Sequence, residues 1–66
     1  MIGDPDIYRA AKLVIDRRGD AAAVFAAGRA DLLLEEGDAH GAIVWGQILE
    51  AIEELLRERL EGEAIN

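Results

Sequence analysis

Two Gly-Asp steps, Gly19-Asp20 and Gly37-Asp38, divide this chain of 66 residues into three segments. Gly can adopt the left-handed conformation that ends a helix, and Asp can cap the N-terminus of the next one. Asp4-Pro5 is a further helix start, because the Asp side chain accepts backbone N–H groups and Pro fits the first helical position. These signals predict helices over 5–18, 21–36 and 39–61, followed by a short tail over 62–66.

The spacing of these helices predicts the fold class. Loops of about two residues make consecutive helices run antiparallel. No stretch alternates between apolar and polar residues, and Ala, Glu and Leu dominate the composition, so we expect no strands. At this length the chain forms one small domain over 1–66. The expected fold is an all-α three-helix bundle with short Gly-Asp turns and antiparallel neighbours.

The composition excludes most classes of enzyme. The chain has no Cys, Ser or Thr, so Tyr8 carries its only side-chain hydroxyl. His40 is the single histidine, and a lone histidine needs further ligands before it can hold a metal ion. No Gly-rich phosphate loop is present. We therefore expect no enzymatic activity, no catalytic residue, no cofactor and no metal.

Charge and hydropathy indicate where the chain acts. The net charge is −7, from 14 acidic and 7 basic residues, and such a surface repels nucleic acid. The N-terminus lacks the basic region and the long apolar run of a signal peptide, and no apolar run reaches the length of a membrane span. We expect a cytoplasmic protein that binds neither nucleic acid nor a membrane.

Each predicted helix carries an apolar stripe that suits a core. Trp45 lies on the third stripe and is expected to fill the space opposite the small residues of the second. The stripes are Ile7, Ala11, Val14 and Arg18 in the first helix, with Tyr8 and Ile15 beside them; Ala23, Ala27, Ala30 and Leu34 in the second, with Ala26 and Leu33 alongside; and Gly41, Trp45, Ile48, Ile52 and Leu55 in the third, flanked by Val44 and Ala51.

Apolar residues remain after the core stripes have been assigned. Gly28 and Gly46 both lie inside predicted helices, where Gly costs about 1 kcal/mol relative to Ala. Because the two helices reverse about Gly37-Asp38, the glycines are predicted to lie level, forming a hollow that admits a partner's backbone or a bulky side chain. The alternative is that this stripe is core and that one helix is misphased. The predicted contact surface consists of Phe25, Gly28, Leu32, Ala42, Ile43, Gly46 and Leu49.

Several sequence blocks within 6–20, 26–38 and 41–55 form a recognisable pattern, most specific at Arg29-Ala30-Asp31, Gly37-Asp38 and Trp45. Together they resemble a family of short bacterial all-helical proteins of unknown function, over about positions 6–57. The resemblance implies a small helical domain and supplies no activity. In that family the positions of Phe25, Gly28, Leu32 and Gly46 usually hold polar or larger residues, which indicates a surface rebuilt by engineering or by divergence.

These patterns favour a protein–protein interaction module. The leading hypothesis is a homodimer formed through the outer faces of the second and third helices, because a two-fold axis uses one apolar patch twice. One alternative is a binder, engineered or natural, that holds a different protein through the same hollow. The other is a small-molecule or metal site in that hollow. Measuring molecular size at several concentrations separates self-association from both alternatives.

Overall fold

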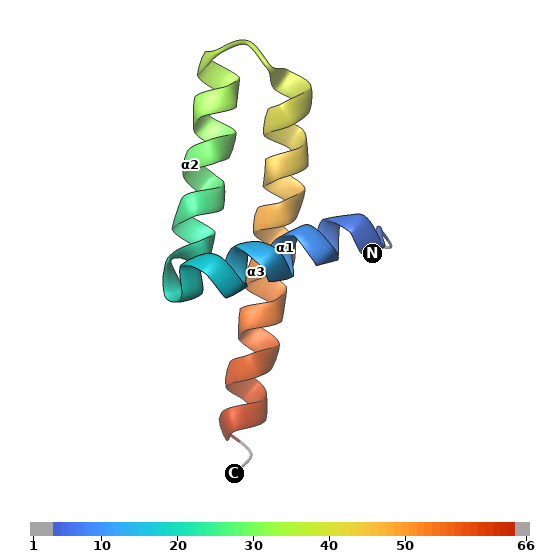
Figure 1. The fold of residues 1–66 in the computed structure, drawn as a ribbon, viewed down its shortest axis with the longest axis vertical. Coiled ribbons are helices and arrows are strands. Elements are labelled where there is room, and N and C mark those ends of the chain that lie inside the picture. Colours follow the sequence, from blue (N-terminus) through green and yellow to red (C-terminus); the bar gives the residue numbers. More distant parts are fainter. Residues whose placement is uncertain (1–3, 65–66) are drawn as a thin grey trace.

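A computed structural model describes residues 4–64 of the chain (Figure 1). Helix α1 spans Pro5–Arg18 and is followed by a 3-10 turn, η1, over Gly19–Ala21. Helix α2 spans Ala22–Glu35, and helix α3 spans Ala39–Ala64. No strand occurs within 4–64, so the expected all-α class is confirmed.

The three helices form a hairpin with a crossing helix. α2 and α3 lie side by side and run in opposite directions, while α1 passes across both of them near the start of α2 (Figure 1). α1, η1 and α2 follow one another without an intervening loop, and the path bends at Gly19, where φ is 56° and ψ is −128°. The expected antiparallel arrangement therefore holds for α2 and α3, and α1 departs from it.

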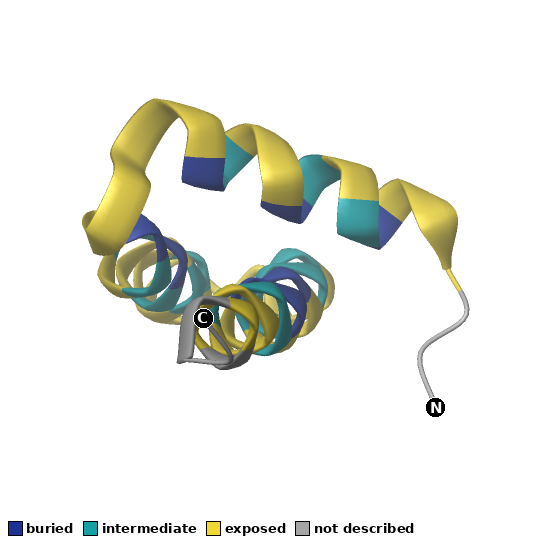
Figure 2. Ribbon diagram, turned by 90° about the horizontal axis from the view of Figure 1, so that it is seen from below, coloured by how far each residue is buried: buried dark blue, intermediate teal, exposed yellow. Residues whose placement is uncertain are grey.

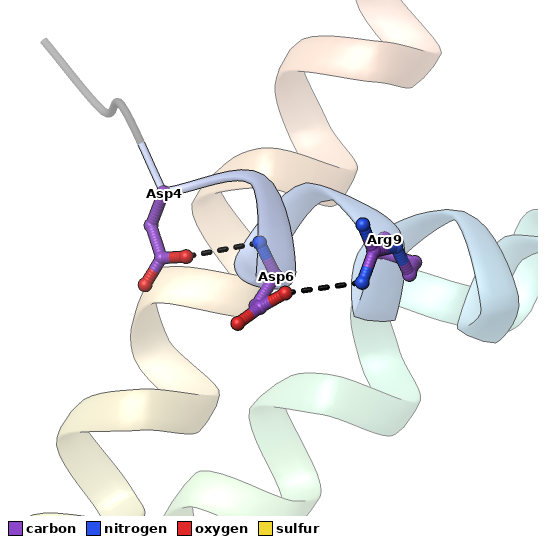
Figure 3. A network of polar contacts seen from close by, with 3 residues as sticks. All are labelled: Asp4, Asp6 and Arg9. Carbon is purple, nitrogen blue, oxygen red and sulfur yellow. Dashed lines mark hydrogen bonds and ion pairs between the residues drawn. The ribbon is translucent and has the colours of Figure 1, made fainter.

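Two aspartates cap helices as the sequence predicted. The Asp4 side chain accepts the backbone N–H of Asp6 at 2.9 Å, and Asp6 in turn pairs with Arg9 at 3.1 Å (Figure 3). At the start of α3, the Asp38 side chain accepts the backbone N–H of Gly41 at 2.8 Å. Such caps satisfy N–H groups that have no partner inside the helix. The starts of α1 and α3 are therefore set by local chemistry.

The turn glycines have the positive φ values that were expected, but the start of α2 and the end of α3 differ from the prediction. Gly19 and Gly37 have positive φ values of 56° and 86°. Asp20 lies inside η1 and does not cap α2, which begins without a side-chain cap. α3 continues through Gly62 to Ala64, because one Gly among helix formers costs only about 1 kcal/mol and no Pro follows. The rest of the predicted tail, 65–66, lies outside the described residues.

The core lies where α1 crosses the hairpin. Figure 2 shows the buried segments of α1 on the side that faces α2 and α3. Four fully buried alanines let the backbones approach closely at the crossing, since interhelical distance follows side-chain size. The buried residues are Ile7, Ala11 and Ile15 of α1, Ala22 and Ala26 of α2, and Ile48, Ala51 and Ile52 of α3.

This core corrects two details of the predicted stripes. In α2 it uses Ala26, which was expected beside the stripe, together with Ala22, whereas Leu34 is 64% exposed. Trp45 is half-buried at the edge of the core, and Ile52 is the largest side chain that is fully buried. Both differences have one cause: α1 covers only the N-terminal end of α2, so the opposite end of the hairpin has no third helix over it (Figure 1).

Candidate interaction surface

The half of the hairpin beyond α1 contains no buried residue. Ala26 is the last buried position of α2, and Ile48 is the first buried position of α3. We call residues 27–47, which include the end of α2, the turn and the start of α3, the hairpin tip. α1 crosses at the other end, so within this structure the tip consists of two helices that face solvent on their remaining sides (Figure 1).

Large apolar side chains are exposed on the hairpin tip. Leu32, Leu33 and Leu34 are consecutive, and consecutive helical residues point about 100° apart, so only one of them can face α3. Leu33 is half-buried, while Leu32 and Leu34 are 44% and 64% exposed. Ile43 at the start of α3 is 61% exposed. A helix that faces water usually carries charged residues at such positions.

The two mid-helix glycines are not required by packing within the chain. A Cβ atom built on Gly28 or on Gly46 would meet no other atom within 4 Å. Gly28 is exposed and Gly46 is half-buried. At both glycines no side chain covers the helix backbone, and no neighbour in the chain requires this. The glycines are nevertheless present although Gly weakens a helix relative to Ala.

Ala42 and Leu49 lie closer to the interior than the rest of the predicted contact surface. Both are half-buried, and Leu49 packs against the core. The predicted surface thus has an exposed part formed by Gly28, Leu32 and Ile43, and a half-buried part that adjoins the core, formed by Ala42, Gly46 and Leu49.

Phe25, the seventh predicted residue, takes part in a cluster within the chain. Its ring meets the ring of Trp45 edge-on, with centroids 5.8 Å apart and planes at 77°. The guanidinium carbon of Arg18 lies 4.2 Å from the Phe25 centroid, and that of Arg29 lies 5.7 Å from the Trp45 centroid. We call these four residues the aromatic–arginine cluster. Each ring is covered by a cation, an attraction that also helps to hold α1 on the hairpin.

Sequence reasoning missed the aromatic–arginine cluster for a physical reason. Arg18 reaches Phe25 only because the chain bends at η1, whereas the Gly19-Asp20 step predicted a reversal there. One signal was available, since Phe25 and Trp45 are the only Phe and Trp and lie on helices predicted to be neighbours.

A polar contact at the other end of α1 joins it to α3. The Tyr8 hydroxyl donates a hydrogen bond to the Glu54 carboxylate. This bond raises the pKa of Tyr8, and desolvation and the negative charges of Glu54 and Glu58 raise it further. A raised pKa keeps the hydroxyl protonated, so the geometry gives Tyr8 a structural role as a donor.

The possible metal ligands do not cluster in the part of the chain that the structure describes. His40 is exposed near the start of α3. Among the side chains that the structure describes, which exclude those of Glu61 and Glu63, no three His, Asp or Glu gather in an arrangement that could hold a metal ion.

Comparisons with known proteins leave the family undetermined. No protein-family model, curated protein or solved structure matches this chain significantly. No helix in the described range 4–64 combines the length and the apolar character needed to cross a membrane. The resemblance to a family of short bacterial proteins, the rebuilt surface and the cytoplasmic location stay predictions.

Proposed function

We propose that this protein is an interaction module that forms homodimers through the outer faces of α2 and α3. The observation that carries the proposal is the uncovered apolar surface of the hairpin tip, where Leu32 and Ile43 of the predicted contact surface are exposed and no residue is buried. Covering such side chains contributes about 25 cal/mol per Å² of apolar surface removed from water. A second copy would provide the cover that α1 provides at the other end.

The distribution of charge favours a second copy at this surface. The chain has a net charge of −7, so two copies repel each other over most of their surfaces. Between Asp38 and Glu50, however, α3 contains no Asp, Glu, Lys or Arg, and α2 contains none from its start to Gly28. Repulsion between copies is therefore weakest along these stretches, which include both glycines.

The glycines suit a close approach between copies. With open space around Gly28 and Gly46, a partner helix can come near the backbone of the hairpin. In the proposed dimer, two hairpins pack as four helices across a two-fold axis, with the glycines near the crossing. In each copy α1 stays packed across α2 and α3 at the end away from the dimer contact. We propose that the three helices form a small three-helix bundle at that end.

Sedimentation velocity at several protein concentrations tests this proposal with a matched set of variants. The test variant combines Gly28→Arg with Gly46→Arg, and the control is Gly62→Arg, a helical glycine that also has open space around it. We expect the wild type and the control to dimerise as concentration rises, and the double variant to stay monomeric with an unchanged or higher melting temperature.

Two results would contradict the proposal. A double variant that melts lower and still associates would show that the glycines serve the fold and not an interface. A wild type that stays monomeric at every concentration would exclude the homodimer and favour the alternative, a binder of a different protein.

A further inference from the structure

A second candidate site lies where the last turns of α1 pass the rings of Phe25 and Trp45. It is an open pocket of about 220 Å³, and it is separate from the hollow predicted between Gly28 and Gly46. Its lining residues are Leu13, Val14, Arg17, Arg18, Phe25 and Trp45.

The lining combines an apolar wall with two positive charges. Leu13, Val14 and the two rings supply the apolar part, and Arg17 and Arg18 supply the charge. Among the side chains that the structure describes, within 4–60 and at 62, the only ion pair joins Arg9 and Asp6, so neither lining arginine pairs with a described carboxylate. In a chain with twice as many acidic as basic residues, two adjacent unpaired guanidinium groups beside aromatic rings form a local site for an anion.

We propose that this pocket binds a small aromatic carboxylate. The ring of the ligand would pack against Phe25 and Trp45, and its carboxylate would accept hydrogen bonds from Arg17 and Arg18, a pairing that suits guanidinium geometry. The volume agrees with this class, because a cavity of about 150 Å³ holds benzene and the pocket is somewhat larger.

Both parts of the ligand are needed for selective binding. An exposed ion pair alone contributes little in water, so a simple anion gains little here. A neutral aromatic molecule leaves both guanidinium groups unpaired. The pocket shares Phe25 with the predicted contact surface, but the proposal does not require the homodimer, because all the lining residues belong to a single copy of the chain.

Trp45 provides the readout, because it is the only tryptophan and lines the pocket. The full chain is titrated with phenylacetate, with phenylacetamide as the uncharged analogue, and with acetate and inorganic phosphate as anions without a ring. We expect phenylacetate to change the Trp45 emission saturably, with binding at least about fivefold tighter than for the other three ligands and weaker at high salt.

Arg17→Gln tests the role of charge without removing a cation from either ring. Arg17 is exposed, and the guanidinium over Phe25 belongs to Arg18. The variant should bind phenylacetate about 3- to 10-fold more weakly and leave phenylacetamide unaffected, while Arg17→Lys should recover part of the affinity. Arg57→Gln, which changes the net charge equally on exposed α3 surface, should bind phenylacetate as the wild type does.

Several results would overturn the proposal. These are a Trp45 emission that does not saturate with phenylacetate, equal binding of phenylacetamide, tighter binding of phosphate, and unchanged phenylacetate affinity in Arg17→Gln. An equal loss of affinity in Arg57→Gln would also overturn it, because the effect would then follow net charge and not the pocket.

Discussion

The two ends of the α2–α3 hairpin contain similar residues and differ in what covers them. At the α1 crossing, Ala22, Ala26 and Ile52 are buried beneath a third helix. At the hairpin tip, Leu32 and Ile43 are exposed although they are at least as apolar. Burial therefore depends on the reach of α1 and on the helix face a residue occupies, since Val24, between the buried Ala22 and Ala26, is 75% exposed.

The dimensions of α1 explain why the cover is incomplete. α1 has 14 residues, and a helix rises about 1.5 Å per residue, so it is about 21 Å long. That length spans two packed helices when α1 lies across them, but the molecule extends 46 Å along its longest axis. An amphipathic helix can bury only the apolar side that faces a packed helix, so a helix with apolar residues on several sides needs more than one packing partner. This requirement is the physical basis of the proposed association.

The largest expected contrast between the two ends comes from removing a large aliphatic side chain. Ile52→Ala should cost about 2–5 kcal/mol, because Ile52 is fully buried and a small domain has little stability to lose. Leu34→Ala at the tip should change the stability of the dilute monomer by less than about 0.5 kcal/mol. Urea unfolding followed by circular dichroism measures both, and equal losses would show that the tip is packed as tightly as the crossing.

Two glycine substitutions, one at the hairpin tip and one at the bend, are expected to change stability by smaller amounts and in opposite directions. Gly28→Ala should stabilise the dilute monomer by about 1 kcal/mol, because the site is helical and open. Gly19→Ala should destabilise it by about 1–3 kcal/mol, because Gly19 has a positive φ in the bend that places α1. Thermal unfolding of both variants gives the signs, and a destabilised Gly28→Ala would mean that the tip has contacts that the structure lacks.

The smallest expected effect concerns the Tyr8–Glu54 contact at the crossing. The pKa of Tyr8 is raised in the folded protein, so its contribution to stability is fully present below its ordinary pKa of about 10 and is lost as pH rises through the higher folded value. Tyr8→Phe should be less stable than the wild type at pH 7 and should lack this alkaline loss. Unfolding from pH 7 to 11 tests this, and parallel curves would contradict it.

Much of the secondary structure could be predicted because its signals are local. Asp4-Pro5 and Gly37-Asp38 set helix ends through caps and positive φ, which depend only on neighbouring residues. The Gly19-Asp20 step is ambiguous, because a left-handed Gly fits both a loop and a bend between helices. The direction of α1 depends on tertiary packing, and the sequence alone did not determine it.

The candidate surface was predicted in part for a related reason. Alanines occur on several sides of α2, so periodicity does not distinguish Ala22 from Ala23 and Ala27 as a core position. The exposure of Gly28 and Leu32 follows from their positions within α2 and could be predicted. Phe25 could not be placed, because its neighbour Arg18 depends on the path of α1.

Hydrogen exchange of backbone amides at two protein concentrations tests the central comparison most directly. Exchange reports local opening, and association protects the elements that a partner covers. We expect amides around Leu33 and Val44 in the hairpin tip to become more protected as concentration rises, while those around Ala11 and Ile52 at the crossing keep their protection. If protection of the tip matched that of the crossing at the lower concentration and did not change at the higher one, both the incomplete cover and the homodimer would be contradicted.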